Sequence, residues 1–584
     1  MEMITLSLDL EGQHCLQIPD VIAVARPQSN TLPKVVLSDA ARERIASVRA
    51  AIEKQWLHDN AESQEPIYGI NTGVGALKST FLQTKSLRDF QSLYVKSHSV
   101  GVGAYFEEEV VRAAILLRAN SFAKGYSGIR LETVEKLLEL LNKGIYPMIP
   151  ERGSLGASGD LGPLSHLAAV LVGEPKAVVI DKEGKLHTLR ELAKPEDIVP
   201  FAIGQTTYYQ VKEFEVDGVR FETHRLEAKE AMGISNGTTF MLALATLMIH
   251  DAMHLMQVSD LAASLSLEAM MGEKNAFDTE LNRIRNIRGQ IETAQNIRLL
   301  TKHSQRMTEE SREAFYYADK YYERSNNSEK PPFKKRVQDR YSLRCVPQVH
   351  GASKDAFRYV QDIVKRELNA PTDNPLIFWN EEKQEYYALS GGNFHGQPLA
   401  IPMDVLSIAL AELGNIADRR IFALINKDLS YGLPSNLVGV MPDGVGMNTG
   451  MMLTQYTSAA LVSENKTYCH PASVDSIPSS GNQEDHVSMG TFAARKARMV
   501  IRNVQYVLAI ELLCAIQALH ISDQVVPFST YTLGERTQKV FDHLSLQFPF
   551  LREDVYMHAR IEQMCSLIRA EALTPWIAEL LVGN

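Results

Sequence analysis

The residues with the most distinctive chemistry lie in GSLGASGDLGPLSHLA at 153–168, where glycines surround Ala157-Ser158-Gly159. A chain bent this tightly can bring the amide nitrogen of Gly159 onto the carbonyl carbon of Ala157, because glycine has no side chain to block the approach. Ring closure with loss of two waters, one of which takes the Ser158 hydroxyl, would leave an exocyclic methylidene. That product is an electrophile that no ordinary side chain supplies. The same residues also suit a plain glycine-rich turn before a helix.

Other common catalytic motifs are missing from the sequence. GVGALK and GVGAYF lack the third glycine of the dinucleotide-binding motif, and GASGD departs from the GxSxG pattern of serine hydrolases. His250 and His254 have the spacing of a metal-binding helix, but Asp251 stands where that motif needs glutamate. Two polar residues on a packed helix are the favoured interpretation, and no metal site is expected.

Composition and charge limit the class of protein. The 584 residues include 60 Lys and Arg against 70 Asp and Glu, a net charge of −10 that disfavours nucleic-acid binding. Five cysteines without a CxxC pair exclude a disulfide scaffold and fit a reducing compartment. The N-terminus lacks a signal-peptide pattern, and the most apolar run, 240–249, is too short for a bilayer. We therefore expect a soluble cytoplasmic protein without nucleic-acid or membrane partners.

The elements expected to position the glycine-rich loop are mainly helical. Periodicity predicts one helix after Ser38 and another over 132–143, while ITLSL and CLQI near the N-terminus predict strands. VVIDKEGKLHTL and LIFWNEEKQEYYAL each predict a hairpin. Three long apolar helices are predicted, over 238–271, 403–427 and 489–520. Because the last is apolar over most of its circumference, we expect a buried bundle that extends across a subunit interface.

These elements predict a mainly α fold in which a smaller, mixed N-terminal region carries the electrophile loop. The expected divisions are an N-terminal region at 1–230, a central long-helix bundle at 231–530 and a helical tail at 531–584. The polar segment 301–337, which contains Pro331-Pro332, is interpreted as an exposed, lid-like insertion. A solvated loop without function is the alternative.

Six blocks, in order, resemble those of the aromatic amino-acid ammonia-lyase and aminomutase family, and the resemblance covers nearly the whole chain. They are YGINTGVG at 68–75, GSLGASGDLGPLSHLA at 153–168, SNGT at 235–238, QDRYSLRCVPQ at 338–348, SGGNFHGQP at 390–398 and SENKTYCHPASVDSIPSSGNQEDHVSMG at 463–490. This resemblance implies that Ala157-Ser158-Gly159 forms 4-methylideneimidazol-5-one (MIO) autocatalytically. It implies no metal, nucleotide or external organic cofactor.

The resemblance also assigns roles to single residues. Tyr68 matches the general base, and its phenol, with an ordinary pKa of ~10, needs a site that favours the phenolate. Arg344 matches the carboxylate-binding residue, whose planar fork suits bidentate pairing, and Tyr341 matches a second active-site tyrosine. The remaining matched positions surround the MIO group, the substrate carboxylate, its amine and its ring: Asn236, Gln338, Phe394, Glu464 and Gln483.

Ser97-His98 match the positions at which members of the family contact the side chain of the substrate. Histidine hydrogen-bonds an imidazole or a phenol but would be left unpaired against a phenyl ring, which disfavours phenylalanine. HPASVDSIP and NQEDHVSM resemble histidine ammonia-lyases; SHSVGVG, YSLRCVPQ and the 301–337 insertion resemble tyrosine ammonia-lyases and tyrosine 2,3-aminomutases. The blocks beside the site favour conversion of L-histidine to trans-urocanate.

Three alternatives remain: conversion of L-tyrosine to p-coumarate, a tyrosine 2,3-aminomutase, and a non-catalytic binding scaffold. The scaffold is disfavoured because the tripeptide, Tyr68 and Arg344 are all intact. The resemblance further implies a homotetramer whose sites draw residues from three subunits. Tyr68, Ser158 and Phe394 would then come from different copies.

Overall fold

The computed structural model describes residues 3–12, 14–27, 32–57, 66–318, 332–439 and 446–582. Within these residues the protein is mainly helical, as predicted, with small two- and three-stranded sheets. Internal contacts divide the chain into two compact units. Unit 1 is Met1–Leu247, Gln361–Asp404 and Pro471–Arg495; unit 2 is Met248–Val360, Val405–His470 and Lys496–Asn584.

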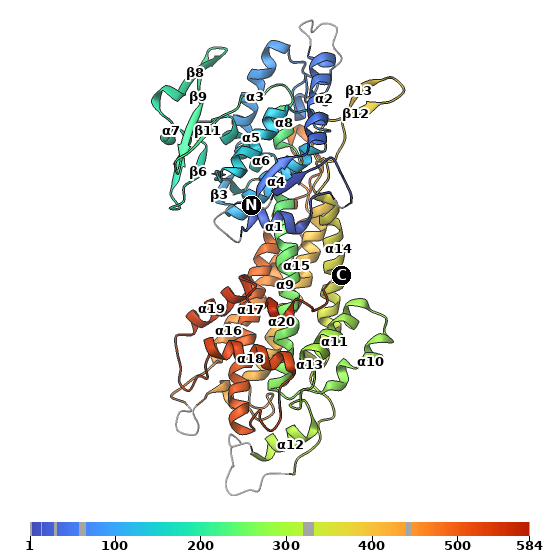
Figure 1. Ribbon diagram of the computed structural model, residues 1–584, viewed down its shortest axis with the longest axis vertical. Helices are drawn as coiled ribbons and strands as arrows, with labels where there is room; N and C mark the ends of the chain where they lie inside the picture. Colours follow the sequence, from blue (N-terminus) through green and yellow to red (C-terminus); the bar gives the residue numbers. More distant parts are fainter. Residues whose placement is uncertain are drawn as a thin grey trace. The chain divides into compact units, whose positions relative to one another are not determined.

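Unit 1 contains a group of short and medium helices (Figure 1). Their bounds are α1 Ile18–Ala25, α2 Asp39–Trp56, α3 Thr84–His98, α4 Glu108–Ala123, α5 Leu131–Asn142, α6 Leu161–Leu171, α7 Leu189–Leu192 and α8 Glu230–Ser235. Helix α4 is buried along nearly its whole length and contacts α1, α2 and α5. Helix α2 confirms the predicted helix after Ser38, whose hydroxyl caps it by accepting from the amide of Ala41 at 3.2 Å.

Small sheets surround these helices. The parallel pair is β1 (Met3–Leu6) with β2 (Lys34–Leu37). The antiparallel pairings are β3 (Val102–Tyr105) with β5 (Pro150–Arg152), β4 (Tyr146–Pro147) with β6 (Val178–Ile180), β6 with β7 (Leu186–Thr188), β8 (Ile198–Ile203) with β9 (Thr206–Val211), β10 (Glu213–Val216) with β11 (Val219–Glu222), and β12 (Leu376–Asn380) with β13 (Glu385–Leu389). The β6–β7 and β12–β13 pairs confirm the two predicted hairpins.

The strand predicted at CLQI is wrong, because helix α1 begins at Ile18 within that segment. Pro19 lies in the first turn, where its fixed φ suits a helix start. The carboxylate of Asp20 accepts from the amide of Gln17 at 2.8 Å and satisfies a free donor at the helix end. These local helix-start signals outweigh the apolar residues that suggested a strand.

Five long helices supply the core of unit 2, and parts of four also belong to unit 1. They are α9 Thr239–Ala269, α14 Val346–Glu367, α15 Gln397–Ile425, α16 Met452–Tyr468 and α17 Gly490–Val525. Helices α9, α15 and α17 confirm the three predicted long helices, whereas α14 and α16 were not predicted. Within unit 2 the bundle holds buried ion pairs, such as Arg420 with Glu511 at 2.6 Å and Lys354 with Asp260 at 2.5 Å.

Shorter helices complete unit 2: α10 Thr279–Arg283, α11 Arg288–Leu300, α12 Glu309–Ala318, α13 Tyr341–Arg344, α18 Glu535–Gln547, α19 Met557–Arg569 and α20 Thr574–Ile577. Brief 3-10 turns lie at Gly75–Leu77, Pro195–Asp197, Lys274–Phe277, Ser435–Leu437 and Ser480–Asn482. Helix α12 lies in the predicted insertion 301–337, of which residues 319–331 are outside the described part. In its described part Arg306, Met307 and Phe315 are buried rather than exposed, so this portion is packed. A role as a lid stays a prediction.

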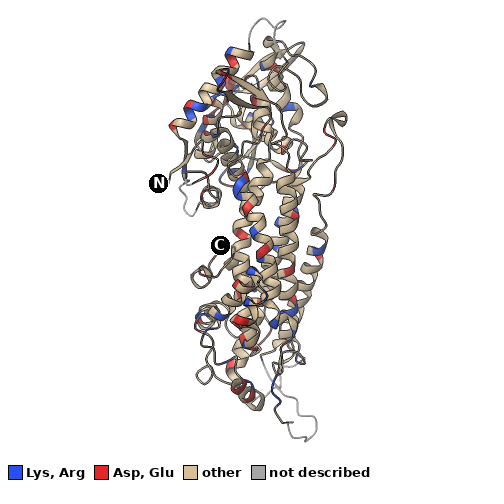
Figure 2. Cartoon of the chain, turned by 90° about the vertical axis from the view of Figure 1, so that its right-hand side faces the viewer, with Lys and Arg blue, Asp and Glu red and all other residues tan. Residues whose placement is uncertain are grey.

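Helices α9, α15 and α17 are long and apolar enough to cross a membrane by length and composition alone. In the folded protein, however, 83%, 72% and 89% of their most apolar stretches are buried. A helix that is apolar nearly all round is expected to be covered by protein in this way. Figure 2 shows basic and acidic positions interspersed along the described helices.

Candidate active site

The tripeptide at 157–159 is folded tightly against Gly237 in unit 1. Gly159 forms bridge pairings with both Ala157 and Gly237. The amide of Gly237 donates to the carbonyl of Ser158 at 3.0 Å, and the amide of Asp160 donates to the carbonyl of Gly237 at 2.7 Å. Gly159 has φ +74°, and a Cβ there would lie 2.0 Å from the Gly237 oxygen. Position 159 therefore requires glycine for both its conformation and its contact.

The carboxyl group of Asp160 is completely buried and connects the loop to two long helices. Oδ2 accepts from the amides of Phe240 and Met241, at 2.8 and 2.9 Å, in the first turn of α9. Oδ1 accepts from the hydroxyl of Ser154 at 3.0 Å and from that of Thr491 on α17. Burial raises the pKa of Asp160, against the effect of these hydrogen bonds.

The start of α17 closes the other side of the loop. The amide of Met489 donates to the carbonyl of Leu155 at 3.2 Å, and the Ser488 hydroxyl donates to the carbonyl of Gly156 at 3.3 Å. A Cβ on Gly156 would lie 2.3 Å from the Ser488 oxygen. The N-terminal ends of α6, α9 and α17 thus converge on the tripeptide. Their partial positive charges favour negative charge that develops there.

Tyr68 lies in a loop that is held against the turn at 480–484. Its hydroxyl accepts from the amide of Gly75 at 3.3 Å, and Lys78 donates to the side-chain oxygen of Gln483. Burial raises the pKa of Tyr68, the Gly75 amide opposes this shift, and the negative charge of Glu484 raises the pKa further. Within one chain, therefore, the phenolate form of Tyr68 requires alkaline pH.

Helix α3 ends at the residues predicted to read the substrate. The ring of His98 stacks on Tyr94 with 3.8 Å between centroids. Its Nδ1 lies 2.9 Å from the carbonyl of Tyr94 and 3.0 Å from the hydroxyl of Ser97. Burial lowers the pKa of His98, which favours the neutral ring. Because its own helix engages Nδ1, Nε2 is the ring atom available to a substrate; it has no hydrogen-bond partner in the described structure.

Side-chain contacts link α3 to the segment that holds the tripeptide. The Ser235 hydroxyl donates to the Tyr94 hydroxyl at 3.1 Å, and the amide of Ala231 donates to the side-chain oxygen of Gln91 at 2.9 Å. Ser235 ends α8 and precedes Asn236, whose Oδ1 is buried without a partner in the described residues. An unsatisfied buried oxygen is costly, which makes Asn236 a suitable partner for a bound group.

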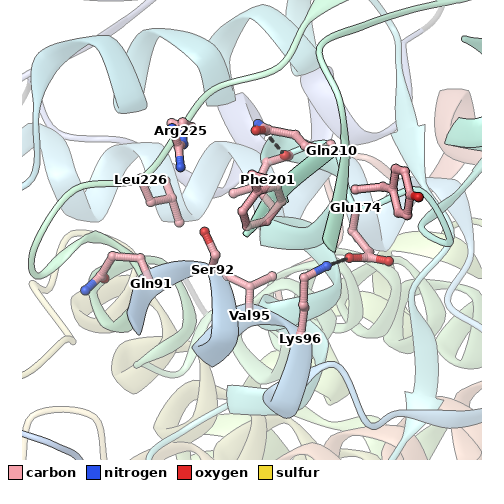
Figure 3. A pocket seen from close by; sticks show the side chains of 12 residues that line it. Gln91, Ser92, Val95, Lys96, Glu174, Phe201, Gln210, Arg225 and Leu226 are labelled. Atoms are coloured by element: carbon pink, nitrogen blue, oxygen red, sulfur yellow. Dashed lines mark hydrogen bonds and ion pairs between the residues drawn. The ribbon is translucent and has the colours of Figure 1, made fainter. Parts of the chain in front are cut away.

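A small cavity lies beside α3 (Figure 3). Lys96 on α3 forms an ion pair with Glu174, which follows α6, and Gln210 donates to the carbonyl of Val172 at 3.0 Å. The cavity volume is about 20 Å³, enough for about one water molecule. This space is therefore too small for an amino acid, and its residues serve to fasten α3.

Phe394 lies in a turn that packs against the same segments as the tripeptide loop. A Cβ on Gly396 would lie 2.6 Å both from the sulfur of Met241 and from the hydroxyl of Ser488. His395 stacks on His486 with 5.6 Å between centroids. The turn that carries Phe394 therefore lies beside the residues that hold the loop at 153–160.

Unit 2 contains the group predicted to bind the carboxylate. Gln338 and Arg344 line a cavity of about 620 Å³. The guanidinium of Arg344 lies 4.6 Å from the ring centroid of Tyr341. The residue Tyr341 is itself 71% exposed. The Nε of Arg344 is buried and lacks a hydrogen-bond partner within the described part of the chain. Glu464 lies on α16, where it accepts from the Tyr468 hydroxyl at 2.8 Å, and does not line this cavity.

The structure thus places the predicted site residues in two groups. Unit 1 holds Tyr68, Ser97, His98, Ala157, Ser158, Gly159, Asn236, Phe394 and Gln483, and unit 2 holds Gln338, Tyr341, Arg344 and Glu464. The sequence analysis missed Tyr94, Asp160 and Glu484. Tyr94 was identifiable as the i−4 neighbour of His98 on one helix face, and Glu484 stands next to Gln483. Asp160 gave no signal of its burial.

Comparison with known proteins identifies the family of this chain. The family model "Aromatic amino acid lyase" matches residues 16–545. A histidine ammonia-lyase of Alkaliphilus oremlandii is 42% identical over 559 residues, 96% of each chain. The solved tyrosine aminomutase of Streptomyces globisporus has a TM-score of 0.81 with 33% identity and covers 99% of each chain. The histidine ammonia-lyase of Trypanosoma cruzi has a TM-score of 0.78 with 34% identity, over 100% of this chain and 96% of that one. The chain is therefore a member of the aromatic amino acid lyase family.

Proposed function

We propose that this protein is an MIO-dependent ammonia-lyase that converts L-histidine to trans-urocanate and ammonia. The observation that carries the proposal is the tight fold at 157–159, where Gly159 lies against Gly237 with no room for a side chain. The family membership supports lyase chemistry, and the name of the Alkaliphilus relative supports histidine as the substrate. We also propose that the protein works in the cytoplasm.

The tripeptide has the atoms needed to form the MIO group without an external reagent. A bond forms between the Gly159 nitrogen and the Ala157 carbonyl carbon. The Ala157 oxygen leaves as water with the amide hydrogens of Gly159 and Ser158, and a C=N bond remains between Ala157 and Ser158. The Ser158 hydroxyl leaves as a second water with the hydrogen of its own Cα, which leaves a Cα=Cβ double bond.

The chain's other residues bind the substrate and move its proton. The MIO group supplies an electrophile that engages the substrate amine and makes ammonia a better leaving group. Tyr68, as phenolate, accepts the β-proton, and Arg344 holds the carboxylate through its planar fork. Asn236, Gln338 and the positions Tyr341, Phe394, Glu464 and Gln483 surround the group and the substrate.

The geometry around His98 supports a substrate ring that carries a polar atom. A neutral His98 with Nδ1 engaged by its own helix presents Nε2 to the substrate ring. Such a group hydrogen-bonds an imidazole or a phenol, so a tyrosine ammonia-lyase or tyrosine 2,3-aminomutase is the second candidate. Its specific support is the likeness to the Streptomyces globisporus tyrosine aminomutase structure.

We further propose that four copies assemble and complete one another's sites. The cavity beside Arg344 has apolar side chains open to solvent, with exposed fractions of 50% at Leu281, 71% at Ile284 and 94% at Val337. A second copy that covers these side chains would exclude water from the carboxylate site. The proposal includes the predicted division of the chain into regions 1–230, 231–530 and 531–584. It also includes the predicted lid at 301–337, which would retain ammonia.

Intact mass and ammonia release together test the proposal. We expect the purified chain to weigh two water molecules less than its sequence, and to release ammonia from an aromatic L-amino acid. A chain of full mass that releases ammonia would contradict the MIO group. A chain two waters lighter that releases no ammonia from any aromatic amino acid would contradict the lyase activity. Full mass without ammonia release would favour a binding scaffold.

A further inference from the structure

Arg118 on α4 is a fully buried cation that lies close to the tripeptide loop. Its Nη1 donates to the carbonyl of Asn236 at 2.8 Å and to the hydroxyl of Thr239 at 3.3 Å. Nε and Nη2 are buried without hydrogen-bond partners among the described residues, and the guanidinium carbon lies 4.4 Å from the ring centroid of Phe122. Asp373, whose charge acts on Arg118, bonds instead to Lys229 at 2.6 Å. A guanidinium buried without a bonded carboxylate is costly, which calls for a functional reason.

Gly237 lies between Arg118 and the tripeptide. A Cβ on Gly237 would lie 2.5 Å from Arg118 Nη1, whereas a Cβ on Gly159 would lie 2.0 Å from the Gly237 oxygen. Gly237 has φ +134°, a conformation that side chains rarely adopt. The guanidinium, the Asn236–Gly237 peptide and the tripeptide are therefore packed in succession, and no side chain intervenes at Gly237.

The same groups form a continuous chain of polarised peptides. Arg118 donates to the Asn236 carbonyl, and the other end of that peptide, the Gly237 amide, donates to the Ser158 carbonyl at 3.0 Å. A cation at one end of such a chain strengthens each later hydrogen bond. Electron withdrawal through the Ser158 carbonyl acidifies the hydrogens on the two atoms that are attached to the carbonyl carbon. These are the Gly159 amide hydrogen, lost in the first dehydration, and the Ser158 Cα hydrogen, lost in the second.

We propose that Arg118 is a positioning residue for self-processing of the tripeptide: through the Asn236–Gly237 peptide it orients and polarises the Ser158 carbonyl during ring closure. This inference rests on the proposed MIO group and adds a residue outside the matched sequence blocks. Arg118 does not contact the substrate in this account. Its loss is expected to change the fraction of chains that form the ring, and not the affinity of formed sites.

Lys124 provides a matched control at the end of the same helix. It is also a buried cation that donates to carbonyls, those of Ser7 at 3.0 Å and Asp9 at 2.6 Å. It bonds as well to the side chain of Asn369 at 3.1 Å, and none of these partners belongs to the tripeptide loop. A general requirement for buried cations at α4 would affect Lys124 and Arg118 alike, whereas the proposed role is confined to Arg118.

The test measures intact mass over time after expression of the full chain as wild type, Arg118→Met, Arg118→Lys and Lys124→Met. We expect Lys124→Met to reach the two-water loss as wild type does. Arg118→Met should process at least about tenfold more slowly, the change that ~1.4 kcal/mol from one charged hydrogen bond produces. Arg118→Lys keeps the cation and should give an intermediate rate. In each Arg118 variant kcat should fall with the processed fraction while KM stays constant.

The outcomes separate this inference from the proposed function. A folded Arg118→Met chain that loses two waters at the wild-type rate would overturn the inference. If Arg118→Met does not fold, Arg118→Gln, which removes the charge but keeps an N–H donor, decides, and wild-type processing of that variant would overturn the inference equally. Slowed processing in Lys124→Met would also contradict a role specific to Arg118. A wild-type chain of full mass would instead contradict the MIO group itself.

Discussion

The proposed chemistry depends on the hydroxyl group of Ser158, because its loss as water creates the methylidene. Ser158→Ala should therefore have full mass and lose turnover by about 10³-fold or more, as when a covalent catalytic group is removed. Ser165→Ala is the control, since Ser165 is a buried serine on the following helix. Intact mass and ammonia release check both variants. A two-water loss in Ser158→Ala would contradict the assigned tripeptide.

The pKa of Tyr68 gives a prediction about pH. Burial raises this pKa, and the base is the deprotonated form, so kcat/KM should rise with pH through the alkaline range. Tyr68→Phe should lower kcat by about 10²–10⁴-fold, the usual contribution of a general base, and should remove this rise from the residual activity. A pH profile of wild type and variant makes the comparison. An identical rise in the variant would assign the base to another residue.

His98 should decide between polar and apolar substrate rings. His98→Phe removes the imidazole that would hydrogen-bond the substrate ring. The ratio of kcat/KM for histidine to kcat/KM for phenylalanine should then fall by about 10–200-fold. Processing of the tripeptide should stay complete, because the His98 ring bonds to its own helix and not to the loop. Competition between the two substrates measures the ratio. An unchanged ratio would show that another residue reads the side chain.

Single residues could be predicted where a sequence block carried them, as at Tyr68, the tripeptide and Arg344. Asp160 and Arg118 could not be predicted in their roles. Each acts through backbone groups of the segment at 236–241, which is far away along the chain. Burial and partner identity depend on tertiary contacts, and a charged residue in a sequence gives no indication of either.

At the scale of secondary-structure elements, the loop between β5 and α6 depends on glycine in two different ways. Gly159 in this loop and Gly184 in the turn between β6 and β7 both have a left-handed φ, +74° and +82°. A Cβ on Gly184, however, would meet nothing within 4 Å. Gly184→Ala should therefore cost only the backbone strain, ~1–2 kcal/mol, and remain fully processed. Gly159→Ala should carry the same strain and in addition displace Gly237, so that no two-water loss occurs. Equal processing in the two variants would show that the close approach is unnecessary.

Element prediction succeeded for the three long apolar helices and missed two other long helices. Helices α9, α15 and α17 were predicted because they are long and mostly apolar. Helix α14 has apolar residues such as Val346, Val360 and Val364 on one face, a pattern that was overlooked, whereas α16 lacks an apolar face. CLQI was predicted as a short strand that follows the turn at Glu11-Gly12, whereas Pro19 and Asp20 lie in the first turn of a helix there. Residues typical of a helix start thus determined the type of this short element, whereas burial of apolar residues determined the long helices.

At the scale of the whole molecule, the account requires sites shared between copies. Chains with Ser158→Ala and chains with Arg344→Ala should each be inactive alone. Expressed together, they should regain activity, because about a quarter of randomly mixed sites combine an intact tripeptide with an intact Arg344. Mixing Ser158→Ala with the double variant Ser158→Ala/Arg344→Ala provides the control and should remain inactive. Absence of recovery in the first mixture would place each complete site within one copy.

Product identity tests the central claim most directly. L-histidine, L-tyrosine and L-phenylalanine are supplied separately, and products are followed by near-ultraviolet absorbance with chromatography for β-amino acids. The account predicts trans-urocanate and ammonia from L-histidine, with little product from the other two. p-Coumarate or β-tyrosine from L-tyrosine, without urocanate from L-histidine, would contradict the histidine assignment and favour the tyrosine enzymes.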